Sequence, residues 1–223
     1  MTRVRLLDLL LALTVAGVAM SFAGITEELD AVQLKDLNAG YRVSILKAID
    51  GQPWPRVKIY ARVAATSEEV AGVFFDYTTA KTYIPDVLDS RISKRVTARS
   101  QEVDYELNVP ILPDEHYTAL NELDNLEWGR YKISWRLLRA RQTKSAEGNL
   151  RIEPSGDAAS VICYTNLVTP GAAMAKLLRS IAINRMDKTV EALVKEVEEK
   201  KRSRPDDLSQ QVQSLRAALA ENP

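Results

Sequence analysis

The sequence predicts an α+β fold, in which a curved antiparallel sheet packs around a long C-terminal helix. One amphipathic pattern runs from Ala172 to about Lys200, and several segments before it alternate apolar and polar residues as half-buried strands do. The last such segment, Val161–Val168, is separated from the helix by Pro170-Gly171. A long helix that follows a sheet buries its apolar stripe on that sheet, so the two layers should share one core.

Residues 1–23 have the features of a secretory signal peptide. Arg3 and Arg5 form a basic start, Leu6–Met20 is almost wholly apolar, and Ser21-Phe22-Ala23 supplies small residues at the positions that a signal peptidase reads. The apolar run is shorter than the roughly 20 residues that span a bilayer, which favours cleavage after Ala23 over a retained anchor. We therefore expect an exported protein, periplasmic if its source is a bacterium.

Composition excludes several classes of partner and site. The chain has 30 basic and 30 acidic residues, and removal of the signal, whose net charge is +1, leaves a charge of about −1. With no basic excess, nucleic acid is not an expected partner. Cys163 is the only cysteine and His116 the only histidine, so clusters of these residues cannot hold a metal. We expect no metal and no other cofactor, and an inert, buried thiol at Cys163.

Residues 24–40 are expected to form a helical lead-in to a domain at 41–200. Thr26 is a plausible N-cap, and Asn38-Ala39-Gly40 is a stop signal. The apolar positions of this helix make a broad stripe that Gln33 interrupts: Leu29, Val32, Leu34 and Leu37. A strand is predicted next, over 41–49, and Asp50-Gly51 is its turn signal.

A second strand is predicted over 56–65, because apolar residues alternate there with polar ones. Thr66 follows at once and, with Glu69 three residues later, predicts a capping box at the start of a helix. A further short helical piece is expected over 79–84, before Pro85 interrupts it.

Six more strands are predicted at hairpin spacing, which indicates an antiparallel meander. Their expected ranges are 91–99, 101–111, 115–123, 129–141, 149–154 and 159–169. The first of them is polar and is therefore expected near an edge of the sheet. Residues 201–223 are interpreted as a charged tail, in which 208–220 forms a weakly tethered helix whose loss hardly affects stability.

The order of a strand, two short helices, an antiparallel run and a long helix is that of the helix-grip fold. Residues 41–199 resemble the START-like superfamily (Bet v 1-like), which includes polyketide cyclase/dehydrase and lipid-transport proteins. Three segments carry the resemblance: Trp54–Val63, Ser67–Asp76 with Tyr83-Ile84-Pro85 after it, and Thr169-Pro170-Gly171 before the long helix. The resemblance implies the fold and no shared catalytic set. The exported N-terminus favours the lipid-handling branch.

If the helix stripe does not fill the curved sheet, a cavity for an apolar guest remains. Burial in such a cavity stabilises a guest by roughly 25 cal/mol per Å² of apolar area. The candidate ligand-binding residues are Val57, Ile59, Val63, Phe75, Tyr105, Leu107, Val109, Tyr131, Ile133, Trp135, Leu177 and Ile181. Phe75, rather than the core residue Phe74, is expected to act in a movable gate with the short helices and 83–85. His116, Tyr164 and Asn166 are candidates for orienting a head group.

Three functions stay open at this point. The first is binding or transport of a hydrophobic small molecule, a lipid above all, in the cell envelope, with transient membrane contact. The second is a cyclase or dehydratase in which His116 and tyrosines move protons, although no catalytic constellation is visible in the sequence. The third is a protein-interaction module whose pocket is vestigial and whose charged C-terminal tail contacts an unknown protein partner.

Overall fold

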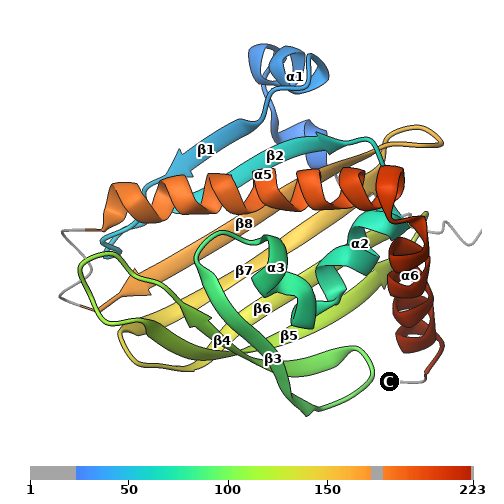
Figure 1. The fold of residues 1–223 in the computed structure, drawn as a ribbon. Helices are drawn as coiled ribbons and strands as arrows, with labels where there is room; N and C mark the ends of the chain where they lie inside the picture. Colours follow the sequence, from blue (N-terminus) through green and yellow to red (C-terminus); the bar gives the residue numbers. More distant parts are fainter. Residues whose placement is uncertain (1–23, 172–177, 222–223) are drawn as a thin grey trace, which may run out of the picture.

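The computed structural model describes residues 24–171 and 178–221 of the chain, and it confirms the α+β helix-grip arrangement (Figure 1). The helices are the 3₁₀ turns η1 (Ile25–Glu28) and η2 (Tyr77–Thr79) and the α-helices α1 (Ala31–Asn38), α2 (Ser67–Phe75), α3 (Ala80–Tyr83), α5 (Arg179–Ser203) and α6 (Pro205–Ala220). The strands are β1 (Val43–Lys47), β2 (Arg56–Val63), β3 (Val87–Arg95), β4 (Ser100–Leu107), β5 (Glu115–Leu126), β6 (Arg130–Ala140), β7 (Thr143–Pro154) and β8 (Ser160–Pro170).

The eight strands form one antiparallel sheet in the order β1-β2-β8-β7-β6-β5-β4-β3. Strands β3 to β8 make the expected meander, and β8 then pairs with β2, so the last strand lies inside the sheet. The polar strand β3 is at an edge, as predicted. Helix α5 crosses the inner face of the sheet and packs on β2 (Figure 1).

Local sequence explains where helix α2 begins. The capping box at the start of α2 is confirmed: the Glu69 N–H donates to Thr66 Oγ1 over 3.2 Å, and the Thr66 N–H donates to Glu69 Oε2 over 2.7 Å. The same Glu69 carboxylate accepts from Lys201 Nζ at 2.9 Å. This contact ties the start of α2 to the end of α5.

The lead-in differs from its prediction. Thr26 does not cap a helix, because it lies within the 3₁₀ turn η1, and α1 begins only at Ala31. Asp30 is the N-cap, and Gln33 completes its capping box by accepting from the Asp30 N–H. The polar residue that interrupts the apolar stripe is therefore a capping residue. Val32 is 69% exposed, so the predicted stripe is not buried as a whole.

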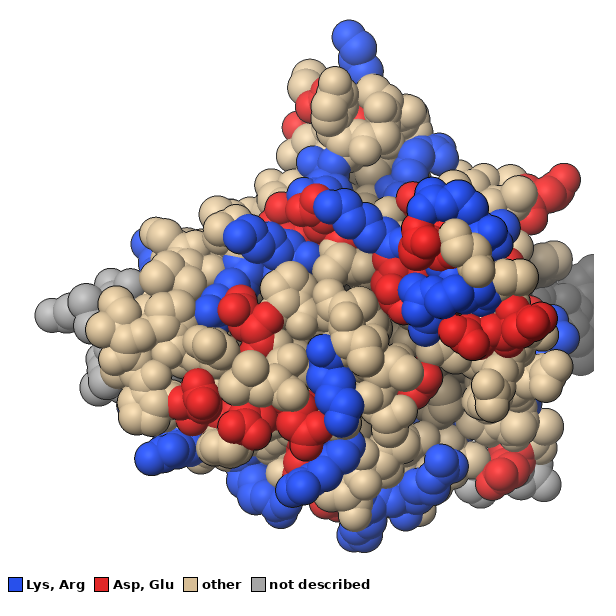
Figure 2. Space-filling model, viewed as in Figure 1, with Lys and Arg blue, Asp and Glu red and all other residues tan. Residues whose placement is uncertain are grey.

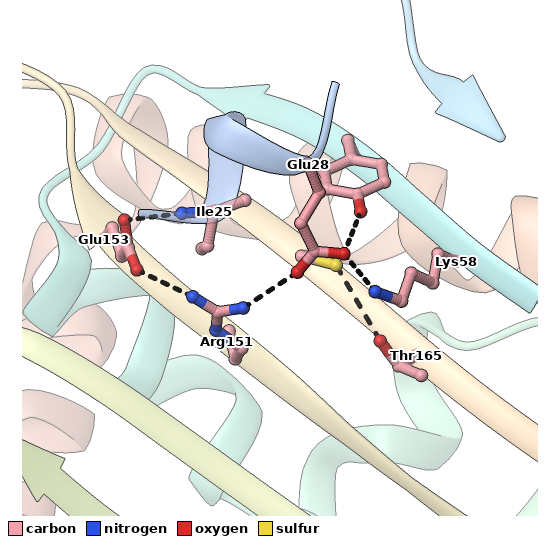
Figure 3. Close-up of polar contacts among 8 residues, drawn as sticks. Ile25, Glu28, Lys58, Arg151, Glu153 and Thr165 are labelled. Atoms are coloured by element: carbon pink, nitrogen blue, oxygen red, sulfur yellow. Dashed lines mark hydrogen bonds and ion pairs between the residues drawn. The ribbon is translucent and has the colours of Figure 1, made fainter. Parts of the chain in front are cut away.

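Polar contacts attach the lead-in to the outer face of the sheet (Figure 3). The Glu28 carboxylate accepts from Lys58 Nζ, from the Tyr60 hydroxyl at 3.2 Å and from Arg151 at 3.2 Å. Glu153 accepts from Arg151 and from the Ile25 N–H. Burial would raise the pKa of Glu28, but the hydrogen bond and attraction of Lys58, with Tyr60 and Arg151, lower it below its usual value. The turn η1 thus covers part of the outer face, over β2, β8 and β7.

The long helix begins at Arg179 and ends at Ser203. The part of its prediction that falls on 172–177 lies outside the described residues. None of the described helices is both long and apolar enough to span a bilayer. On the face shown in Figure 2, basic and acidic side chains are interspersed, in keeping with the equal numbers of the two charges.

Helix α6 is packed on the domain, in contrast to the weakly tethered tail that the sequence suggested. Leu208 and Leu215 are 4% and 0% exposed and belong to the main hydrophobic core. A Cβ atom at Gly72 in α2 would lie 3.2 Å from backbone atoms of Gln211 and Val212, so the two helices approach closely at this glycine. Residues 205–220 therefore contribute to the fold.

Candidate ligand cavity

A cavity of about 280 Å³ lies between the inner face of the sheet, α3 and the first turns of α5. Its walls come from most of the fold: α2 and η2, the turn at 84–86, the ends of β3 to β8, and α5. The apolar and aromatic lining includes Trp54, Phe74, Ala80, Tyr83, Ile84, Leu107, Val109, Ala119, Trp135, Leu137, Val168, Leu178, Ile181, Ala182 and Met186. Such a lining suits an apolar guest.

Of the sequence-predicted ligand residues, one group lines this cavity and another does not. The lining residues are Tyr105, Leu107, Val109, Trp135 and Ile181. The residues that lie instead in the close-packed core are Val57, Ile59, Val63, Phe75, Tyr131 and Ile133. Leu177 lies outside the described residues. Contact of any of them with a ligand stays a prediction.

Lining and core residues lie at different ends of the same strands. On β6, Tyr131, Ile133 and Trp135 share the inner face, yet only Trp135 reaches the cavity. Over the other two, α2, α6 and the second half of α5 fill the space with buried side chains, such as Val73, Leu215 and Leu193. The helix layer therefore fills one end of the curved sheet and leaves the other end hollow.

The two adjacent phenylalanines have the opposite of their expected places. Phe74 lines the cavity, with its ring centroid 6.0 Å from that of Trp135. Phe75 is 8% exposed and packs edge-on against Tyr77 at 5.5 Å, within the core. Neighbouring helical residues point in different directions, so only one of the two reaches the cavity, and it is Phe74. A gating movement stays a prediction.

Tyrosines and amides supply most of the polar lining. Tyr105 and Tyr117 face each other on β4 and β5 and stack with centroids 5.0 Å apart. Trp135 Nε1 donates to Asn166 Oδ1 at 3.4 Å, and Asn166 Nδ2 donates to the Tyr164 hydroxyl at 3.3 Å. Tyr164 and Asn166, two of the suggested head-group residues, are thus at the cavity.

The cavity phenols are neutral at neutral pH, and burial makes them weaker acids still. It raises the pKa of each of the five tyrosines that line the cavity: Tyr77, Tyr83, Tyr105, Tyr117 and Tyr164. Interaction with neighbouring tyrosines raises the pKa of Tyr105 further. The cavity therefore presents uncharged hydroxyl groups at neutral pH.

Glu115 also lines the cavity, but its carboxylate is held by the protein. The side chain is buried, and it accepts from the backbone N–H groups of Arg141 at 2.8 Å and Gln142 at 3.0 Å, and from the Thr143 hydroxyl at 3.1 Å. These three donors stabilise the carboxylate in its buried position. Glu115 fixes the turn between β6 and β7 to the start of β5.

One arginine bridges two loops beside the cavity. Arg185 in α5 makes an ion pair with Asp86 at 3.0 Å and donates to the Asn108 carbonyl at 2.7 Å. The Asn108 N–H donates in turn to the Asp86 carbonyl at 2.9 Å. Arg185 therefore links α5 to the segment after α3 and to the end of β4.

His116 and Cys163 are both away from the cavity. Glu115 and Tyr117 turn inward, so strand alternation turns His116 outward, where its side chain is 56% exposed and lies 3.8 Å from Glu106. Cys163 is 1% exposed on the outer face of β8, with its sulfur 3.7 Å from the Thr165 hydroxyl (Figure 3). Burial raises the pKa of the Cys163 thiol, which disfavours the reactive thiolate.

Two further hollows, of about 370 and 430 Å³, are lined largely by charged and polar side chains. His116 borders the first and Cys163 the second. Aromatic and aliphatic residues are few in them, such as Tyr105 and Tyr117 in the first and Trp135 and Leu167 in the second, whereas they make up most of the inner lining. The inner cavity is therefore the candidate site for an apolar guest.

Comparison with solved structures finds the same fold in proteins of two kinds. A STAR-related lipid transfer protein from Xanthomonas axonopodis is 17% identical, with a TM-score of 0.63 over 70% of this chain and 93% of that one. Human STARD10 is 18% identical, with a TM-score of 0.58 over 74% of each chain. The Zhui aromatase/cyclase from Streptomyces sp. R1128 is 21% identical, with a TM-score of 0.53 over 66% of this chain and 96% of that one. No family model and no curated protein matches the sequence.

These likenesses establish the START-like fold that the sequence suggested. At such low identity they show the fold alone, and that fold occurs both in lipid transfer proteins and in an aromatase/cyclase. A function for this chain has to be argued from the residues of its own cavity.

Proposed function

We propose that this protein binds and carries a hydrophobic small molecule, most simply a lipid, in its inner cavity. The observation that carries the proposal is the hollow end of the sheet, which is walled by aromatic and aliphatic side chains. Structures with this fold include lipid transfer proteins. If residues 1–23 act as a cleaved signal, the protein works in the cell envelope, and in the periplasm of a bacterium.

The size of the cavity bounds its guest. A volume of about 280 Å³ is at the small end of the range for ligand sites, so one acyl chain or a molecule of similar bulk suits it better than two chains. Burial of about 400 Å² of apolar surface contributes about 10 kcal/mol before the costs of association. Association costs about 4 kcal/mol or more, which leaves at most about 6 kcal/mol, so we expect dissociation constants of tens of micromolar.

The place of His116 argues against the cyclase or dehydratase alternative in its expected form. That alternative used His116 as a proton carrier, but the side chain lies on the outer face of β5. The cavity tyrosines have raised pKa values and are weak acids at neutral pH. Binding needs neither an acid nor a base, so it accounts for these features more directly.

Loading requires a way in, and we place it at α3 and the loops that Arg185 bridges. Ile84 and Pro85 line the cavity there, and so do Val109 and Pro110 of the loop after β4. Ile111, next in that loop, is 88% exposed. An exposed apolar side chain beside the cavity suits transient contact with a membrane during loading.

Binding of N-phenyl-1-naphthylamine, an uncharged probe that fluoresces in apolar surroundings, tests the proposal. The wild type should bind one probe per chain with saturation at micromolar concentration. Ala182→Trp, which places an indole in the cavity wall, should weaken binding at least tenfold, whereas Ala217→Trp on the exposed side of α6 should not. Both variants should keep the wild-type circular dichroism. A wild type without saturable binding would rule out the proposal.

A further inference from the structure

The cavity ends against one layer of aromatic side chains, which we call the cavity floor. On β4, β6 and β8 the innermost residue of the lining is aromatic, and the next residue on the same face of the strand belongs to the close-packed core. Phe74 of α2 completes the floor from the helix side. The three pairs of lining and core residues are Tyr105 and Val103, Trp135 and Ile133, and Tyr164 and Ile162.

Trp135 is the central residue of the floor, and the absence of a side chain at Gly148 gives its indole room. The two residues are partners across β6 and β7. A Cβ atom at position 148 would lie 2.5 Å from Cζ2 of the indole, so the ring occupies the space that any other residue there would need. Gly148 is in turn the partner of Asn166 on β8, and Trp135 Nε1 donates to Asn166 Oδ1 at 3.4 Å. The indole therefore extends from β6 over β7 towards β8.

Neighbouring groups hold the indole in this position. Its ring centroid lies 5.1 Å from that of Tyr164 and 6.0 Å from that of Phe74, and both pairs are tilted. Aromatic pairs with such geometry attract each other beyond the effect of burial alone. Asn166 Nδ2 also donates to the Tyr164 hydroxyl at 3.3 Å, so the polar groups of the floor are bonded to one another. The floor thus offers a guest mainly the surface of its rings.

The space behind Trp135 is filled. Ile133 and Leu150 are partners on β6 and β7, and both are 0% exposed. An interior as closely packed as this accepts further atoms only at the cost of strain. The apolar end of a guest's chain can therefore lie against Trp135 but not pass it, and the polar end stays near the entrance, where water is available.

We propose that Trp135, placed by Gly148, receives the far end of the guest's chain and so sets the longest chain that the protein binds well. This inference rests on the proposed function and names a residue that determines its specificity. Each additional CH₂ group that finds room in the cavity should tighten binding about fourfold. The first group that meets the indole should not, so affinity should rise with chain length and then stop rising.

Displacement of N-phenyl-1-naphthylamine by 1-alkanols of increasing length, from 1-hexanol to 1-tetradecanol, tests the inference. The affinity of the wild type should rise steeply up to one chain length and level off or fall beyond it. Trp135→Leu leaves space where the indole was, so this break should move to chains longer by about two carbons. Leu137→Ala is the matched control, because it enlarges the cavity on the same face of β6 but nearer the entrance, and it should leave the break in place.

Quenching of tryptophan fluorescence by a bromine atom at the chain end supplies a readout that does not depend on the folding of Trp135→Leu. The quencher is the ω-bromo derivative of the longest 1-alkanol that binds well. Trp54 also lines the cavity, beside Val109 and Leu178 near the entrance, whereas Trp128 is 82% exposed and outside the lining. Trp54→Phe, which keeps Trp135, should retain the quenching, and Trp135→Phe should lose most of it.

Three results would overturn the inference and leave the proposed function standing. They are a wild type that binds the probe but shows no break, a break that Trp135→Leu does not move, and quenching that Trp54→Phe abolishes and Trp135→Phe retains. A wild type without saturable probe binding would instead refute the proposed function.

Discussion

Ile133→Arg should unfold the domain. Ile133 is 0% exposed on the inner face of β6, between Leu123 of β5 and Leu150 of β7, which are 3% and 0% exposed. A guanidinium at this position has no counter-charge and no access to water, so we expect a loss of more than about 4 kcal/mol of unfolding free energy. Urea denaturation followed by circular dichroism measures the effect.

Ser134→Arg is the matched control, because Ser134 is the next residue along β6 and borders the hollow on the outer face. It should change the unfolding free energy by less than about 0.5 kcal/mol. If Ile133→Arg melted like the wild type and still bound the probe, the inner and outer faces of the sheet would be reversed relative to the structure.

Removal of residues 205–223 should destabilise the protein strongly. The deletion uncovers the α2 surface that Leu208 and Leu215 bury, and it removes the bond from Gln211 Nε2 to Asp76 and the pair of Arg216 with Glu68. Leu215→Ala alone should cost about 2 to 5 kcal/mol, as fully buried leucines do. The deletion should cost at least as much.

Gln213→Ala, at an exposed position of the same helix, should be nearly neutral and serves as the control. Thermal melts of the three variants decide the question. A truncated chain with an unchanged melting temperature would show that α6 is a loosely attached tail, as the charged segment before it suggested.

The strand pattern was predictable because its period is local. Val57, Ile59 and Ile133 all point to the inner face, as their alternation indicated. Whether a residue on that face meets a side chain or a void depends on which helix lies above it, and no periodicity records this. Trp135 and Ile133 are two residues apart on one face, yet only the first reaches the cavity.

The burial of α6 and the capping box of α1 both have signals in the sequence. Leu208, Gln211, Leu215 and Ala218 recur at helical spacing after Pro205, and all four are buried in α6. The Asp30 and Gln33 pair is a capping box of the same kind as Thr66 and Glu69.

The most direct test is native mass spectrometry of the protein purified under non-denaturing conditions from its own host. We expect the mass of one chain plus one small lipid, and we expect the added mass to vanish in Ala182→Trp while persisting in Ala217→Trp. A wild-type chain that always has its bare mass, and that takes up no probe, would contradict the claim that the hollow end of the sheet exists to hold a guest.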